Sequence, residues 1–157
     1  MPTAAVESRM HNPLLMFPDA FKGIQAIHEA ARAGGLPDTT CHMVHLRASQ
    51  INGCSFCAEM HSREMREAGE SDERIYTVAA WREAPYFTEA ERVALAVTEA
   101  LTRLSDRPDP VPDELWDELR MNYDEPAIAA LLIEIGLINV WNRVNAAVRQ
   151  VAGASKG

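Results

Sequence analysis

The chain has 157 residues and a formal net charge of −8, with 47% hydrophobic and 24% charged residues. This composition is typical of one soluble domain, which buries roughly 70% of the surface that its unfolded chain exposes. The negative charge and the lack of a basic run argue against a nucleic-acid partner, because phosphate backbones are bound through Lys and Arg.

The N-terminal half predicts an arm followed by three helices. Residues 1–18 contain three prolines and predict an extended arm that packs the apolar run Leu14–Phe17 against another surface. Apolar residues at helical spacing predict helices over residues 19–33, 37–51 and 54–68. Glycine follows each of these three segments within two residues, and glycine commonly ends a helix.

The C-terminal half predicts four more helices. A capping pattern at residues 71–74 starts a short helix, and a Thr-x-x-Glu capping box at residues 88–91 starts a long one. Residues 105–112 are rich in Pro and Asp and predict a loop. Apolar spacing then predicts a helix around Leu115 and Leu119 and a last helix over residues 125–151.

The last predicted helix is apolar on almost all sides from Ile128 to Ile138, apart from Glu134. Such a helix is central in a fold or lies at a subunit interface. Its apolar run is shorter than the ~20 residues that a membrane span needs. No alternating strand pattern occurs, so the sequence predicts an all-α fold with one helical domain over residues 19–152, after the arm and before a tail, 153–157.

Two cysteines and a histidine form the most specific pattern, Cys54-Ser-Phe-Cys57 with His61 four residues later. Asn-Gly at residues 52–53 is a turn signal, so a new helix is expected to begin near Cys54. Side chains three and four apart share one face of a helix, which brings both thiols and the imidazole together. The helix N-terminus favours a thiolate there.

This arrangement predicts redox chemistry. A thiolate that attacks a peroxide becomes a sulfenic acid, which condenses with a nearby thiol to a disulfide, and a dithiol donor then reduces the disulfide. Three cysteines are an odd number and do not indicate a disulfide framework. With no secretory signal at residues 1–17, a reducing cytoplasm is expected.

Two other interpretations of the cysteine pair stay open. The thiols could be buried and inert, or they could bind structural zinc with His61, although such zinc sites need a fourth ligand. Cys41 is interpreted as a core thiol that stays reduced. Glu134 is interpreted as an ion-pair partner, for example of Arg47 or Arg143.

The stretch Leu46–His61 closely resembles the core motif of the alkylhydroperoxidase D-like group in the carboxymuconolactone decarboxylase superfamily, and residues 80–92 and 138–145 resemble its later segments. The resemblance implies an all-helical domain with the cysteine pair at the start of a central helix, assembled as a homotrimer or homohexamer. It also implies that peroxide attacks Cys57, that Cys54 resolves the intermediate, and that His61 belongs to a proton relay.

One position departs from the family pattern. The family has a glutamate twelve residues before the first cysteine, where this chain has His42. The relay could use the imidazole, could use Glu59 or Glu134, or could be impaired, and Glu59 points away from the cysteine stripe. An imidazole titrates near pH ~6.5 and carries no negative charge. We therefore expect activity to be weak at acid pH, and His42→Glu to raise it near neutral pH.

Three functions follow as hypotheses. The first is a thiol-dependent peroxidase or disulfide oxidoreductase with catalytic Cys54, Cys57, His61 and His42, using a hydroperoxide and a dithiol donor, and no cofactor or metal. The second is a carboxymuconolactone decarboxylase-type enzyme, for which a dithiol has no use. The third is a non-enzymatic oligomer that senses redox state or binds metal. No membrane partner is expected.

Overall fold

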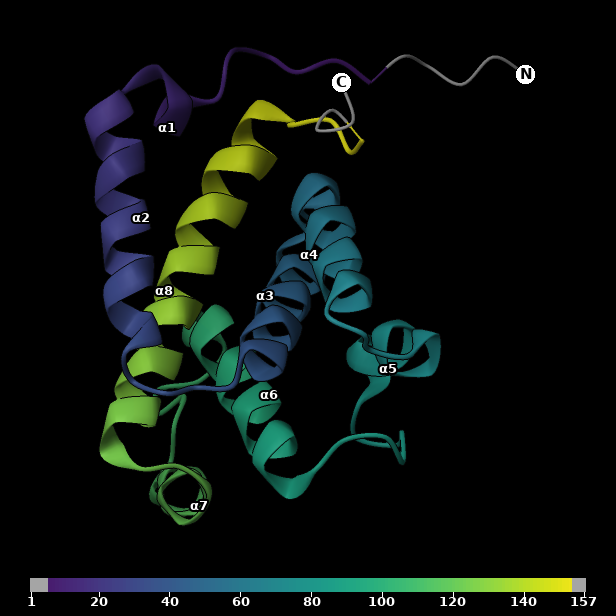
Figure 1. The fold of residues 1–157 in the computed structure, drawn as a ribbon, viewed down its shortest axis with the longest axis vertical. Helices are drawn as coiled ribbons and strands as arrows, with labels where there is room; N and C mark the ends of the chain where they lie inside the picture. Colours follow the sequence, from purple (N-terminus) through teal and green to yellow (C-terminus); the bar gives the residue numbers. More distant parts are fainter. Residues whose placement is uncertain (1–5, 154–157) are drawn as a thin grey trace.

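The computed structural model describes residues 6–153, and these residues form helices and no strands, which confirms the all-α prediction (Figure 1). Residues 1–5 of the predicted arm and 154–157 of the predicted tail lie outside the described residues. The elements are α1 (Pro13–Met16), α2 (Pro18–Arg32), α3 (Asp38–Asn52), α4 (Ser55–Glu67), α5 (Asp72–Thr77), η1 (Val78–Ala80), α6 (Glu89–Thr102), η2 (Leu104–Asp106), α7 (Asp113–Asn122) and α8 (Glu125–Val148).

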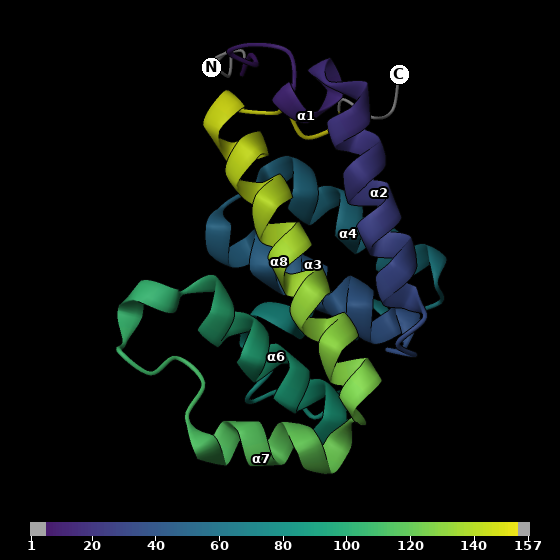
Figure 2. The same cartoon turned by 90° about the vertical axis from the view of Figure 1, so that its left-hand side faces the viewer.

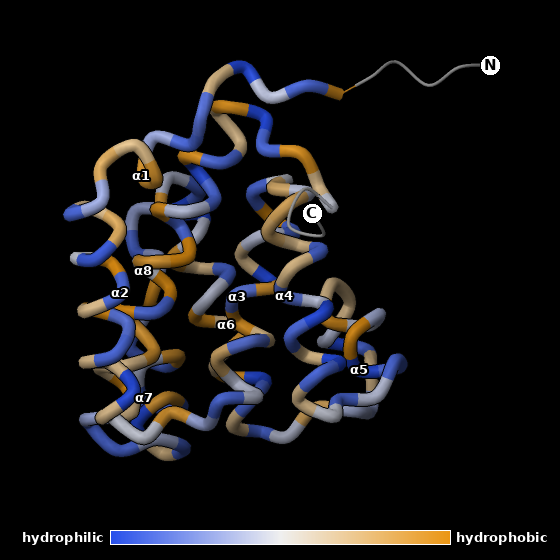
Figure 3. The backbone as a smooth tube through the Cα atoms, turned by 45° about the horizontal axis from the view of Figure 1, so that its top comes forward, coloured by the Kyte–Doolittle hydropathy of each residue, from blue (hydrophilic) through white to orange (hydrophobic). Residues whose placement is uncertain are grey.

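Helices α3 and α8 form the centre of the molecule. α3 packs against α4, α6 and α8, and α2 covers α8 on the other side (Figures 1 and 2). Hydrophobic and hydrophilic residues alternate along the helices rather than dividing the chain into halves (Figure 3). α3 contributes to both hydrophobic cores, with Met43 and Leu46 packed towards α4 and η1 and Val44 packed towards α6 and α8.

A tight turn between α3 and α4 positions the cysteine pair. Gly53 has φ 69°, a left-handed conformation that a residue with a Cβ adopts only at a cost, and it ends α3. Cys54 is the N-cap of α4, as the Asn-Gly signal predicts. Asn52 donates hydrogen bonds to Asn139 and Asn142 of α8, so the turn is fixed to the neighbouring helix.

The predicted arm is only partly extended. Asn12 caps the short helix α1 through a hydrogen bond from Leu14 N, and α2 already begins at Pro18. Leu15, Met16 and Phe17 are exposed in the single chain, so the prediction that this run packs against another surface is not fulfilled within one molecule. The Thr88 capping box of α6 forms as predicted.

α8 is the one helix among the described residues that is long and apolar enough to cross a membrane. Length and composition also fit the core helix of a globular protein, and α8 contacts five other helices. It buries three polar side chains that all have hydrogen-bond partners, namely Glu134, Asn142 and Asn145. α8 is therefore packed into the bundle on one side and exposed on the other.

Candidate active site

The two motif cysteines form a disulfide at the start of α4. Cys54 and Cys57 are bonded through their sulfur atoms, and their Cα atoms are 5.3 Å apart. The Cys57 N–H also points at the Cys54 sulfur, 3.2 Å away, which is the N-cap contact of the helix. Cys41 is not part of this bridge. The predicted pairing is therefore present in the structure.

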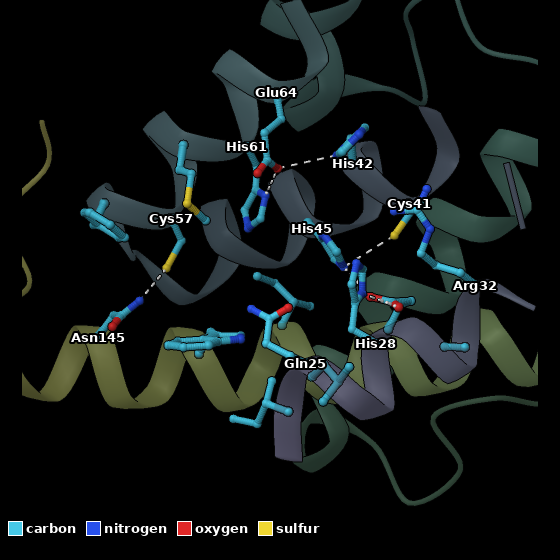
Figure 4. A pocket seen from close by; sticks show the side chains of 18 of the residues that line it. Gln25, His28, Arg32, Cys41, His42, His45, Cys57, His61, Glu64 and Asn145 are labelled. Atoms are coloured by element: carbon cyan, nitrogen blue, oxygen red, sulfur yellow. Dashed lines mark hydrogen bonds and ion pairs between the residues drawn. The ribbon is translucent and has the colours of Figure 1, made fainter. Parts of the chain in front are cut away.

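A cavity of about 660 Å³ lies in front of Cys57, between α2, α3, α4 and α8 (Figure 4). Of the four residues predicted from the sequence, Cys57, His61 and His42 line this cavity, whereas Cys54 is buried and does not line it. A small molecule that enters the cavity therefore meets the second cysteine of the motif.

His61 is anchored by a carboxylate from its own helix. Its Nδ1 lies 2.7 Å from Glu64 Oε2, three residues further along α4. The other ring nitrogen, Nε2, is buried and has no hydrogen-bond partner among the described residues. Since an imidazole whose Nδ1–H donates to a carboxylate keeps Nε2 free as an acceptor, His61 can exchange a proton with a group in the cavity.

His42 shares the same carboxylate. Its Nδ1 lies 3.4 Å from Glu64 Oε2, within ion-pair distance but outside hydrogen-bond geometry. The proximity of Glu64, opposed by partial burial, raises the pKa of His42 above its ordinary value. For Glu64, burial disfavours the charged form, but the contacts with His42 and His61 outweigh it and lower its pKa. Glu64 is therefore ionised at neutral pH.

The sulfur of Cys57 has a donor of its own on α8. Asn145 Nδ2 lies 3.2 Å from Cys57 Sγ, and both residues are buried (Figure 4). A hydrogen bond to a charged sulfur is stronger than one to a neutral sulfur, so this amide stabilises a thiolate once the disulfide is reduced.

A second polar cluster occupies the other end of the cavity. Glu134 of α8 binds two histidines, with Oε2 at 2.9 Å from His45 Nε2 and Oε1 at 2.7 Å from His28 Nδ1. Cys41 Sγ lies 3.6 Å from the same His45 nitrogen. Burial lowers the pKa of His45. Burial, and to a lesser extent the charge of Glu134, raises the pKa of the Cys41 thiol. His45 and His61 bring the two clusters together, with ring centroids 4.9 Å apart.

A profile of the carboxymuconolactone decarboxylase family matches residues 18–100, more than half of the chain. The chain belongs to the carboxymuconolactone decarboxylase family. It is 34% identical over 131 residues to YdfG, an uncharacterised protein of Bacillus subtilis, and this match covers 83% of the chain and 88% of YdfG.

Solved structures related to this family share the fold. A protein of unknown function from Agrobacterium tumefaciens, assigned provisionally to antioxidant defence as AhpD, is 34% identical, with a TM-score of 0.85 over 94% of this chain and 99% of its own. A peroxidase-related protein from Silicibacter is 21% identical, with a TM-score of 0.75 over 88% of this chain and 73% of its own. The resemblance to alkylhydroperoxidase D-like proteins is therefore confirmed at the level of family and fold.

The structure also bears on the position of His42, where this chain departs from the family pattern. The expectation for His42→Glu assumed that no carboxylate orients His61, and this premise is wrong, because Glu64 does so. Glu64 was missed in the sequence although its spacing from His61, three residues, is a usable signal for a shared helix face. Glu59 instead pairs with Arg63.

Two further expectations need correction. Glu134 hydrogen-bonds to His28 and His45 rather than pairing with an arginine, and these contacts are ion pairs only when the histidines are protonated, whereas Arg47 pairs with Glu99. Cys41 is not a simple core thiol, because it is only partly buried and lines the cavity. No pattern in the sequence predicts His28 at the site, because this contact depends on how α2 packs against α8.

Proposed function

We propose that this protein is a thiol-dependent peroxidase that reduces organic hydroperoxides through Cys57 and Cys54. The observation that carries the proposal is that Cys57 and His61 line the same cavity, with His61 Nδ1 held by Glu64 and Nε2 without a hydrogen-bond partner among the described residues. A nucleophile, a base and a group that orients the base are the parts that activated cysteines require.

The reaction begins with the reduced pair. His61 takes the proton of the Cys57 thiol, and Asn145 together with the N-terminus of α4 stabilises the thiolate. The thiolate attacks the terminal peroxide oxygen and the O–O bond breaks. Cys57 becomes a sulfenic acid, and the alkoxide leaves as an alcohol with the proton from His61.

The second step uses Cys54. Its thiol attacks the Cys57 sulfur, the disulfide forms, and the sulfenic oxygen leaves as water with the Cys54 proton. The short distance between the two residues, one turn of helix, supports this role. A dithiol donor then returns both cysteines to thiols by exchange, and its oxidation balances the reduction of the peroxide.

The cavity supports a hydroperoxide that carries an organic group. Its volume of about 660 Å³ falls in the range of small-molecule sites. Apolar side chains close to Cys57 provide contacts for a hydrocarbon group, namely Phe56, Met60, Ile138 and Trp141. The provisional assignment of the Agrobacterium relative to antioxidant defence supports the same class of reaction.

The test is peroxide consumption by the reduced protein, using cumene hydroperoxide and hydrogen peroxide. We expect one equivalent of alcohol for each Cys54–Cys57 disulfide, with Cys41 still reduced in peptide maps. Cys57→Ser should abolish consumption, and Cys54→Ser should stop at a sulfenic acid on Cys57. Ser55→Ala, an exposed change within the same turn, serves as the control. Unchanged thiol content after excess peroxide would contradict the proposal and favour the decarboxylase alternative.

A further inference from the structure

We propose that Cys41, His45 and Glu134 form a binding site for a divalent transition-metal ion, with zinc as the best-fitting ion, at the end of the cavity away from the disulfide. The three ligand atoms, one sulfur, one nitrogen and one carboxylate oxygen, all lie within 4.8 Å of one another. They come from α3 and α8, and His28 from α2 completes the surroundings through Glu134.

The distances are close to those of a coordinated ion. Zinc binds sulfur at ~2.3 Å and nitrogen or oxygen at ~2.0 Å, so neighbouring ligands in a tetrahedron are separated by about 3.3 to 3.6 Å. Here His45 Nε2 is 2.9 Å from Glu134 Oε2 and 3.6 Å from Cys41 Sγ. All three ligand atoms lie within 4.8 Å of one another, so an ion would replace the His45–Glu134 hydrogen bond, and water from the cavity would take the fourth position.

The way in which these groups converge distinguishes a metal site from a catalytic triad. In a cysteine–histidine–carboxylate triad, the thiol and the carboxylate bind opposite nitrogens of the ring. Here Cys41 and Glu134 both approach the same atom, His45 Nε2. The sulfur, nitrogen and oxygen atoms therefore cluster together instead of lying in a relay across the imidazole ring, and a cluster of this kind can coordinate one ion.

Charge gives a second reason. Glu134 is only 3% exposed and lies in a largely apolar helix, where a carboxylate is costly unless it is paired, and its two histidine partners carry a full positive charge only when protonated. A divalent cation bound by one thiolate and one carboxylate leaves no net charge in the cluster. A mixed set of sulfur, imidazole and carboxylate favours zinc or cobalt over magnesium or calcium, which prefer oxygen ligands alone.

The proposed ligands are also oriented by a hydrogen bond from a neighbouring residue, as metal ligands usually are. Histidines and carboxylates that bind metals are usually oriented by a further hydrogen bond, and such partners affect metal affinity by about 10 to 100-fold. His28 Nδ1, 2.7 Å from Glu134 Oε1, supplies this contact. All four side chains line the cavity, which gives the ion a path of entry.

This site differs from the zinc set considered from the sequence. That set used Cys54, Cys57 and His61, but the first two are joined in a disulfide and cannot bind as thiolates. The new set uses the thiol that the disulfide leaves free. Because neither disulfide cysteine is a ligand, metal binding and the proposed peroxidase reaction can be tested separately.

The experiment titrates the oxidised protein, with Cys54–Cys57 closed, first with Co²⁺ and then with Zn²⁺ in competition. We expect one ion per chain, a thiolate-to-cobalt charge-transfer band that zinc removes, and a rise in Tm with zinc. Cys41→Ser should abolish the band, and both Cys41→Ser and Glu134→Gln should weaken binding more than about tenfold. Circular dichroism checks that both variants fold, and Cys41→Ser, which changes one atom, is the decisive one.

The matched control is His42→Gln, which removes a histidine from the same cavity and the same helix but outside the cluster. Its affinity should equal that of the wild type. The proposal is overturned if the wild-type protein binds neither ion, if Cys41→Ser retains the band, or if His42→Gln loses binding, because the last result would place the ion between His42, Glu64 and His61.

Discussion

His61 has one constrained nitrogen and one free nitrogen, and this asymmetry is the central feature at the scale of single residues. Glu64 fixes the ring through Nδ1 and supplies a negative charge, while Nε2 stays open. A positioned imidazole of this kind contributes typically about 10²- to 10⁴-fold to proton-transfer catalysis. The residue that sets its orientation is therefore the most informative one to change.

Glu64→Gln should lower peroxide consumption near neutral pH by about tenfold or more and move its rise to higher pH. The glutamine keeps the shape and can still accept from His61 Nδ1, but the lost charge no longer stabilises protonated His61, so the Cys57 thiolate forms less readily. The measurement is a pH–rate profile beside Glu67→Gln, an exposed glutamate on the same helix. Equal rates for Glu64→Gln and wild type at every pH would rule out this role.

His42 should stabilise the protein at acid pH rather than at alkaline pH. Its pKa is raised by Glu64, so its contribution is complete below the ordinary value of ~6.5 and is lost as pH rises through the folded-state pKa. His42→Gln should therefore cost more stability at pH ~5.5 than at pH ~9. Urea unfolding at both pH values measures this, with surface His11→Gln as the control. If His42→Gln lost more unfolding free energy at alkaline pH than at acid pH, the predicted direction of the pH dependence would be wrong.

At the scale of elements, each helix around the cavity contributes a stripe at helical spacing. On α4 the stripe includes Cys57, His61 and Glu64, and on α8 it includes Glu134 and Asn145 together with the apolar residues between them. Helical periodicity makes such stripes recognisable. Their chemistry depends on the turn that aims α4 at α8, and this turn depends on Gly53.

Gly53→Ala should destabilise the protein by about 1 to 2 kcal/mol. The position has φ 69°, and a Cβ there meets no atom within 4 Å, so the cost comes from backbone conformation rather than from a clash. Gly23→Ala, in the exposed interior of α2, is the control and should stabilise by about 0.5 to 1 kcal/mol. Thermal and urea unfolding of both variants give the comparison. A neutral Gly53→Ala would mean that the turn relaxes into another conformation.

At the scale of the whole molecule, the single chain leaves a group of apolar side chains exposed on the neighbouring elements α1, α2 and α8, besides others elsewhere. α8 lies in front in Figure 2, with no helix covering its outer face. Exposed apolar residues occur there, on α2 and around α1, namely Ile133, Val140, Ile27, Leu15, Met16 and Phe17. Several exposed apolar side chains on neighbouring elements are a common property of subunit interfaces.

We therefore expect a homo-oligomer, a trimer or hexamer as the family resemblance implies, when light scattering is measured at micromolar concentration. A charge at the centre of the exposed face, as in Ile133→Glu, should shift the mass towards the monomer, because an unpaired charge in an apolar interface is costly. Met121→Glu, a change at an exposed residue of α7, should leave the mass unchanged. A wild-type protein that is monomeric at this concentration would disprove the expectation.

The sequence by itself determined the helical class, the approximate position of each helix, and the convergence of Cys54, Cys57 and His61. These features depend on local information: apolar spacing, capping residues such as Thr88, and the Asn-Gly turn, all of which act within a few residues. The same local rule could also have found Glu64, since it lies three residues from His61.

Only the tertiary structure decided which distant groups meet at the cavity. Asn145 reaches Cys57 across 88 residues, and Glu134 reaches His45 across 89 and His28 across 106. These contacts depend on how α2, α3, α4 and α8 pack. Helical periodicity determines which side chains share a face but not which faces meet. Burial then makes the contacts necessary, because a carboxylate inside an apolar helix such as α8 is stable only with partners, and packing alone determines that they are histidines.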